Sequence, residues 1–137
     1  MTAAHSPQKA IVVAAAVIEQ NDSFLVTRRQ QGVHLAGLWE FPGGKIDSTE
    51  THKAALRREL IEELDTDAEI GDLIFQTSHD YVDLTVTLYF YRCTLIGKPR
   101  PLLGQEMRWV PRGELKSLGF PPPDEELIRL LTESAAQ

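Results

Sequence analysis

Three glutamates in the segment "RRELIEEL" have a spacing that suits metal-dependent chemistry. Glu59, Glu62 and Glu63 stand at positions i, i+3 and i+4, and on a helix turning about 100° per residue their carboxylates point into one sector of roughly 100°. Carboxylates grouped in this way can bind Mg²⁺, which prefers a few of them together with water and phosphate oxygens. An exposed helix in which Arg58 pairs with Glu62 at i+4 has the same pattern. The spacing alone leaves both interpretations open.

A glycine-rich segment precedes these acids. In "EFPGGK", residues 40–45, the paired Gly43 and Gly44 leave the backbone open to close approach and its carbonyls free. The two glycines would equally suit a simple tight turn. The whole chain is acidic, with a formal net charge of -6. A divalent cation placed between carboxylate and phosphate would still allow it to bind a small phosphate compound.

The surrounding sequence predicts the elements that must position these residues. Apolar residues recur at helical spacing from Thr51 to Leu64, with Thr51 as N-cap and with Leu60, Ile61 and Leu64 facing the core. Elsewhere we expect a buried strand over 10–19, a turn at 21–23, a strand over 24–29, a hairpin or meander within 73–95, a strand over 106–110, a short helix over 111–118, and a final helix from Asp124, its N-cap, to residue 134. Strands alternating with helices predict an α/β fold with a mixed sheet covered on both faces.

Length and composition set the outer limits. The 137 residues suit one domain, for which we expect a mobile leader over 1–9 and a folded part over 10–137. No apolar run approaches the roughly 20 residues of a membrane span, and the single Cys93 excludes an internal disulfide. We therefore expect a cytoplasmic protein, monomeric or homodimeric, with no membrane partner. Its negative charge argues against binding long nucleic acids.

The motif residues carry a resemblance to a known family. From Gly44 the chain reads G, five residues, Glu50, seven residues, then Arg58-Glu59-Leu60, one residue and Glu62-Glu63. This resembles the Nudix box, G-x5-E-x7-R-E-U-x-E-E-x-G-U, in which U is aliphatic. The segments "AGLWEFPGGKI", "RWV" and "FPPPDEELIRLL" are similar to the MutT-like branch, which includes 8-oxo-dGTP diphosphatases and CTP pyrophosphohydrolases. The resemblance implies a single α/β/α sandwich around a mixed β-sheet.

The resemblance also implies roles for the motif residues. Glu59, Glu62 and Glu63, with the Gly43 carbonyl, would bind one to three Mg²⁺ ions, and Mn²⁺ could replace them. Glu59 or Glu62 would take the proton of the attacking water, and Glu59 is favoured. Arg58 would orient Glu50 and the acidic cluster, while Gly44 and Glu50 belong to the motif itself.

Substrate contacts follow less directly from the resemblance. Arg29, and more weakly Lys45, would face the nucleotide phosphates. Trp39 and Phe41 would line the base pocket or serve only in the core. Asp124 stands where this branch commonly has an asparagine that reads the base. An ionised Asp124 would suit the exocyclic amine of cytosine or adenine, whereas a protonated one would suit an oxidised guanine.

Two positions depart from the family pattern. The final Gly-aliphatic pair of the box is Asp65-Thr66 here, so we expect Asp65 to adopt a left-handed conformation at the helix end, at a cost of about 1 kcal/mol. The family often has another acid just before the Gly-Gln that precedes "RWV". That position is Leu103, and Glu106 is near it but out of register.

The expected function is Mg²⁺-dependent hydrolysis of a nucleoside triphosphate to a monophosphate and pyrophosphate, which would sanitise oxidised nucleotides such as 8-oxo-dGTP. A pyrophosphatase for CTP or a modified dCTP is the alternative, followed by an ADP-ribose hydrolase. A non-catalytic nucleotide-binding module is the alternative from another class. In each case the partner is a small nucleotide.

Overall fold

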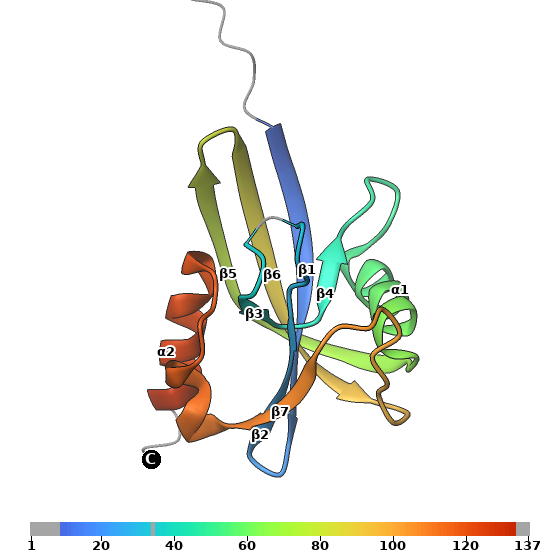
Figure 1. Cartoon of the computed structure of the whole chain (residues 1–137). Coiled ribbons are helices and arrows are strands. Elements are labelled where there is room, and N and C mark those ends of the chain that lie inside the picture. Colours follow the sequence, from blue (N-terminus) through green and yellow to red (C-terminus); the bar gives the residue numbers. More distant parts are fainter. Residues whose placement is uncertain (1–8, 34, 134–137) are drawn as a thin grey trace, which may run out of the picture.

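The computed structural model describes residues 9–33 and 35–133. In this part of the chain, seven strands form one sheet that lies between two helices (Figure 1). The strands are β1 Lys9–Gln20, β2 Ser23–Arg28, β3 Trp39–Glu40, β4 Gly43–Lys45, β5 Ala68–Tyr81, β6 Leu84–Leu95 and β7 Met107–Pro111. The helices are α1 His52–Leu64 and α2 Glu125–Glu133, with short 3-10 turns η1 Arg112–Ser117 and η2 Pro122–Asp124.

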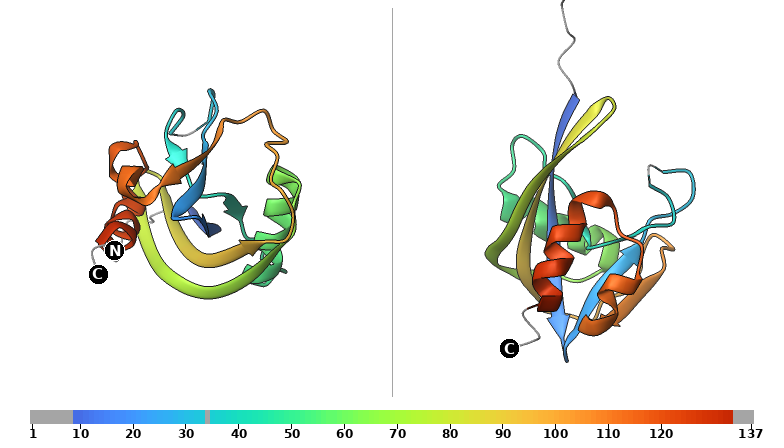
Figure 2. Two further views of the ribbon diagram at one scale, coloured as in Figure 1. Left: turned by 90° about the horizontal axis from the view of Figure 1, so that it is seen from below. Right: turned by 90° about the vertical axis from the view of Figure 1, so that its left-hand side faces the viewer.

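The sheet is mixed, as predicted. Its order is β3-β2-β1-β6-β5, with β4 paired to β1 and β7 paired to β2. The β1–β6 pair is parallel and the other pairs are antiparallel. Strands β5 and β6 curve strongly, and α1 and α2 lie on opposite sides of the sheet (Figure 2). The prediction of a single α/β/α domain is therefore confirmed.

Each helix covers its own hydrophobic core. Along β1 the side chains alternate between the two faces, because successive residues of a strand point to opposite sides. Ala15 and Val17 join the core beneath α2, whereas Ala14, Ala16 and Ile18 join the core beneath α1. This explains why residues 10–19 form an almost continuous apolar run.

Helix α1 begins and ends where the sequence predicts. The Thr51 side chain caps it by accepting a hydrogen bond from the Ala54 N–H at 3.1 Å. Leu60 and Leu64 are fully buried, but Ile61 is 46% exposed. Its predicted place in the core is therefore wrong. Ile61 lies about 100° around the helix from Leu60, which turns it toward solvent.

The exit from α1 has the predicted left-handed residue. Asp65 has φ 57° and ψ 34°, and its N–H donates to the Ile61 carbonyl at 3.1 Å. Its carboxylate pairs with the Arg100 guanidinium. The backbone N–H groups of Arg100 and Leu102 donate to the carbonyls of Leu64 and Glu63, at 2.8 and 2.9 Å. The segment before β7 therefore satisfies carbonyls that the end of a helix leaves without partners.

Other boundaries differ slightly from those predicted. The β5–β6 hairpin is confirmed, although β5 starts at Ala68 rather than near residue 73. Lys9, placed in the leader, already belongs to β1, and residues 1–8 and 134–137 lie outside the described residues. Helix α2 begins at Glu125, directly after η2, because the prolines at 121–123 do not continue a regular helix. Among the described residues, no helix is long and apolar enough to cross a membrane.

Candidate active site

Arg58 holds the acidic face of α1 together. Its Nε and Nη2 donate to the two carboxylate oxygens of Glu50 at 2.7 and 2.8 Å, and Nη1 donates to Glu59 at 2.9 Å. The Glu62 carboxylate lies farther away, at 3.4 Å from Nη1. The pKa of Glu50 is lowered, chiefly by its hydrogen bonds from Arg58. Arg58 thus links the loop before α1 to the acids on the helix.

Gly43 and Gly44 bring the backbone of β4 against two different neighbours. A Cβ added to Gly43 would stand 2.1 Å from the Ala14 carbonyl oxygen on β1. A Cβ added to Gly44 would stand 2.4 Å from the Glu59 carboxyl carbon. Both distances are far below van der Waals contact. The glycine pair therefore allows β4 to lie between β1 and the first of the three acids.

Glu63 is the acid in the least favourable environment. Its Oε2 atom is buried and has no hydrogen-bond partner among the described residues. Burial raises the pKa of Glu63 to about 8, and the charges of Glu59 and then Glu40 add to this effect. A buried carboxylate beside other acids is costly unless a cation compensates it. The unsatisfied oxygen is consistent with an ionic ligand at this position.

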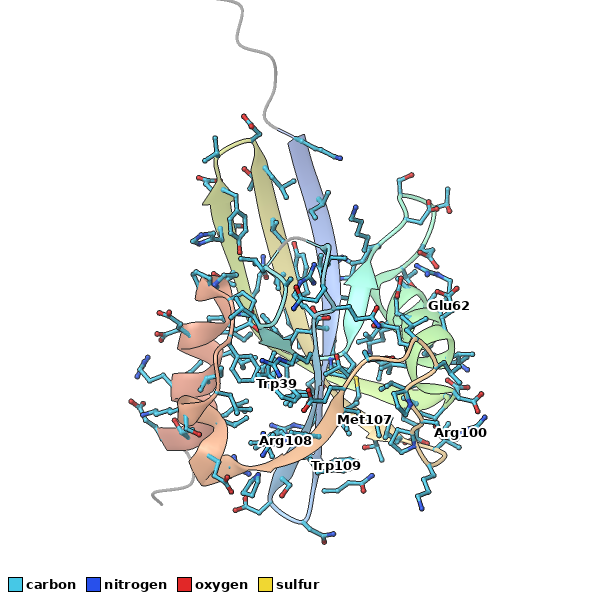
Figure 3. The ribbon with its side chains drawn as sticks, in the orientation of Figure 1. Trp39, Glu62, Arg100, Met107, Arg108 and Trp109 are labelled. Atoms are coloured by element: carbon cyan, nitrogen blue, oxygen red, sulfur yellow. The ribbon has the colours of Figure 1, made fainter. Side chains whose placement is uncertain are left out.

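The three box glutamates are not equivalent. Glu59 and Glu63 lie close enough to influence each other. The Glu62 side chain is 58% exposed, and its place on α1 is labelled in Figure 3. Within residues 9–33 and 35–133, no three His, Cys, Asp or Glu side chains form a ready-made metal cage. The hard oxygen donors of Glu59, Glu63 and the Gly43 carbonyl are of the type that Mg²⁺ prefers, with water and phosphate oxygens completing its shell. The donor set fits a divalent cation that binds together with a phosphate substrate.

A cavity of about 440 Å³ extends from this acidic region toward α2. Gly43, Gly44 and Glu63 line one part of it, and Asp124 lines another. Aliphatic side chains of β1 and β6 form much of its wall: Ile11, Val13, Leu84, Val86 and Leu88. Its volume falls in the range of small-molecule pockets. The cavity is therefore large enough for a small organic molecule and reaches the acidic residues of α1.

Asp124 is buried in this cavity. The residue is only 4% exposed to solvent. Burial, reinforced by the charge of Glu40, raises the pKa of Asp124 to about 7. Asp124 directly precedes α2, at the predicted N-cap position, but the described structure shows no hydrogen bond from the helix to its carboxylate. Asp124 is therefore a polar group of the cavity rather than a helix cap.

The two aromatic residues proposed for the base pocket lie in different places. Phe41 lines the cavity, where it stacks on Phe120 at 5.4 Å and meets the edge of Phe90 at 6.0 Å. Trp39 is packed in the core and does not line this cavity. The guanidiniums of Arg28 and Arg108 lie 5.6 and 5.5 Å from the centre of its ring. Trp39 and Arg108 are labelled in Figure 3. Trp39 and Phe41 therefore both belong to the core beneath α2, but only Phe41 also lines the cavity.

Glu40 and Tyr81 are cavity residues that sequence reasoning missed. Glu40 accepts a hydrogen bond from Arg29 at 2.8 Å, and burial raises its pKa despite this partner. Tyr81 closes another part of the wall together with Leu35. Glu40 does adjoin the "FPGG" segment, which was a usable signal. No local pattern points to Tyr81, because the folding of the β5–β6 hairpin brings it to the cavity.

Arg29 and Lys45, the two cations predicted to face the phosphates, both line the cavity. Arg29 forms an ion pair there with Glu40, at 2.8 Å.

Leu103, which replaces the family's additional acid, is 56% exposed. Glu106 instead pairs with Arg28 at 3.4 Å and lies away from the main cavity lining. The described structure therefore gives Glu106 an ion-pair partner outside the acidic cluster.

The fold and this site define a class of α/β/α hydrolase in which a glycine-rich segment and an acidic helix act on phosphate compounds. Members of this class generally use divalent metals. A family model described as the NUDIX domain matches residues 13–130. The chain belongs to the Nudix family and is a Nudix hydrolase.

Individual relatives agree with this assignment. An 8-oxo-dGTP diphosphatase of Haemophilus influenzae is 38% identical over 130 residues, which cover 93% of this chain and 96% of that protein. A CTP pyrophosphohydrolase of Escherichia coli is 44% identical over 66 residues, 48% of this chain and 49% of that protein. The solution structure of the E. coli ORF135 protein superposes with a TM-score of 0.82 at 30% identity, and the match covers 95% of this chain and 94% of that one.

Proposed function

We propose that this protein is a Mg²⁺-dependent nucleoside triphosphate pyrophosphohydrolase that acts on oxidised nucleotides such as 8-oxo-dGTP. The observation that carries the proposal is the buried Glu63 Oε2 atom, which has no hydrogen-bond partner among residues 9–33 and 35–133, in a residue that lines a cavity of about 440 Å³. The 38% identity to an 8-oxo-dGTP diphosphatase over nearly the whole chain supports the substrate class.

The residues of the chain divide the work between them. Glu59, Glu62, Glu63 and the Gly43 carbonyl would hold the divalent ion, which supplies Lewis-acid polarisation of the phosphate when it is bound. Glu59 would take the proton of the attacking water. Arg58 keeps the Glu59 carboxylate in place through its 2.9 Å hydrogen bond and is itself fixed by Glu50. The aliphatic wall of the cavity would shield a bound nucleoside from water.

Asp124 supports a second candidate, a pyrophosphohydrolase for CTP or a modified dCTP. An ionised carboxylate only accepts hydrogen bonds and so suits the exocyclic amine of cytosine. The neighbouring carboxylate of Glu40 gives this end of the cavity more acceptor character. The identity of 44% to a CTP pyrophosphohydrolase, over about half of each chain, agrees with this alternative.

A panel of nucleotides tests both candidates. The purified protein is incubated with Mg²⁺ and 8-oxo-dGTP, dGTP, CTP, a modified dCTP or ADP-ribose, and the products are separated by chromatography. We expect a nucleoside monophosphate and pyrophosphate from 8-oxo-dGTP or from a cytosine nucleotide. A preparation of the Glu59→Gln variant controls for contaminating phosphatases. If no nucleotide is hydrolysed but nucleotides still bind, the proposed catalytic function is wrong.

The choice between the two bases should depend on pH through Asp124. Because its pKa is about 7, the group is mostly protonated and can donate a hydrogen bond at pH 6, and is mostly ionised at pH 8. Because the ratio of protonated to ionised Asp124 falls about 100-fold over these two pH units, we expect the ratio of kcat/KM for 8-oxo-dGTP to that for CTP to fall by up to about 100-fold. Taking a ratio cancels the titration of catalytic groups shared by both substrates.

Asp124→Asn provides the matched variant for this measurement. An amide both donates and accepts a hydrogen bond at every pH, so the ratio should become independent of pH and favour 8-oxo-dGTP. A variant that keeps the wild-type pH profile would show that Asp124 does not read the base.

A further inference from the structure

The segment between β6 and β7 passes beside the last turn of α1, which carries Glu63 (Figure 1). We propose that Gln105, in this segment, is a positioning residue that holds Glu63 in place as a metal ligand. The inference rests on the metal-binding role that the proposed function gives to Glu63. Residues that orient metal ligands without touching the metal typically change metal affinity or activity about 10- to 100-fold when they are replaced.

Glu63 differs from the other box glutamates in how it is held. Arg58 donates to Glu59 at 2.9 Å and lies 3.4 Å from Glu62. The Glu63 carboxylate is not among the described partners of Arg58, and its Oε2 atom has no hydrogen-bond partner within residues 9–33 and 35–133. The position of Glu63 therefore depends strongly on the backbone that carries it.

The backbone of Glu63 is held by two donors from the segment before β7. Its carbonyl accepts from the Leu102 N–H at 2.9 Å and from Gln105 Nε2 at 3.1 Å. Because α1 ends at Leu64, this carbonyl is one of those to which the helix itself offers no partner. Helix ends fray, and the pairing of this carbonyl opposes fraying. Gln105 thus helps to fix the turn from which the Glu63 side chain projects.

The Gln105 side chain is itself held in one orientation. The residue is 8% exposed. Its Oε1 accepts from the Leu103 N–H at 2.9 Å, across a turn in which Gly104 has φ 73°. Since Oε1 faces a donor and Nε2 faces an acceptor, only this orientation of the amide satisfies both. Gln30, just after β2, donates to the Leu103 carbonyl at 2.8 Å. The amide of Gln105 therefore connects the last turn of α1 to the end of β2.

Thr66 provides a matched control at the same junction. It is 5% exposed, and its Oγ1 accepts from the Gly97 N–H at 2.8 Å and donates to the Asp67 carbonyl at 3.0 Å. Thr66→Val and Gln105→Met each keep the approximate shape of the side chain and each remove two hydrogen bonds. Of these two side chains, only Gln105 bonds to Glu63 in the described part of the chain. A difference between the variants in metal binding therefore reports on Glu63 rather than on the stability of the junction.

Binding of Mn²⁺ to the nucleotide-free protein tests the inference. Isothermal titration calorimetry is compared for the wild type, Gln105→Met and Thr66→Val, and urea denaturation measures the stability of each metal-free protein. We expect Gln105→Met to bind Mn²⁺ about 10- to 100-fold more weakly, and Thr66→Val to bind it as the wild type does, although both variants lose stability. In steady-state kinetics, Gln105→Met should need a correspondingly higher Mg²⁺ concentration for its half-maximal rate, with the KM for the nucleotide unchanged at saturating Mg²⁺.

Three results would overturn the inference: a wild type that binds no Mn²⁺, wild-type affinity in Gln105→Met, or an equal loss of affinity in Thr66→Val. Should Gln105→Met fail to fold, Gln105→Asn keeps the amide on a side chain that is one methylene group too short for both partners. Wild-type Mn²⁺ affinity in that variant would overturn the inference as well. Because Mn²⁺ binding requires no turnover, a negative nucleotide panel would refute the proposed hydrolysis without changing this result.

Discussion

Glu63→Gln is expected to abolish catalysis and to stabilise the metal-free protein at the same time. Loss of a carboxylate from the metal-binding set should remove about 4 kcal/mol of transition-state stabilisation, which lowers kcat/KM about 1,000-fold. The same substitution removes a carboxylate whose Oε2 atom is buried without a hydrogen-bond partner among the described residues. The neutral amide avoids the cost of burying that charge. Function and stability therefore make opposite demands on this position.

The stabilisation should depend on pH in a defined direction. Burial raises the folded-state pKa of Glu63 from the ordinary 4.5 to about 8. Between these values the folded protein keeps a proton that the unfolded chain has lost, so the free energy of unfolding of the metal-free wild type falls as pH rises through this window. Glu63→Gln should lack this contribution, and its advantage should grow from pH 5 to pH 8 to a few kcal/mol at most.

Urea denaturation of metal-free protein at pH 5 and pH 8, together with steady-state kinetics, measures both effects. Glu114→Gln, at an exposed position in η1, is the control and should change neither quantity. Mg²⁺ should raise the stability of the wild type more than that of Glu63→Gln. A variant that retained activity, or that was destabilised equally at both pH values, would contradict the role given to Glu63.

Gly44→Ala is expected to lower kcat/KM about 100-fold with little loss of stability. The new methyl group would stand 2.4 to 2.7 Å from the three carboxyl atoms of Glu59. That carboxylate is the far end of a flexible side chain and can move away, so we expect the free energy of unfolding to change by less than about 1 kcal/mol. Displacement of a reacting group by about 1 Å can reduce a rate 100-fold.

The control for this prediction is another glycine. A Cβ added to Gly113 meets nothing within 4 Å, so Gly113→Ala should leave activity and stability almost unchanged. Kinetics with the best substrate of the nucleotide panel and urea denaturation of both variants measure the effects. Full activity in Gly44→Ala would show that the position of the Glu59 carboxylate is not critical.

Much of the fold could be predicted from local patterns, because those patterns reflect local physics. Thr51 caps a helix through its own side chain, and the alternation of Leu84, Val86 and Leu88 with threonines and tyrosines gives a strand with two faces. The left-handed conformation of Asp65 follows from its position at the helix end. The misplacement of Ile61 has the same origin, since helical spacing shows which residues are apolar but not which of them the sheet covers.

The sequence by itself determined the family, the order of the elements and the acids available for chemistry, since each depends on residue types at short and regular spacings. Only the tertiary structure decided which groups share a site. It buried Glu63 while leaving Glu62 exposed, kept Trp39 in the core, and brought Glu40 from β3 and Tyr81 from β5 to the cavity that Asp124 lines. Burial and the pKa shifts that follow from it depend on contacts between residues far apart in the chain, and no local spacing records those contacts.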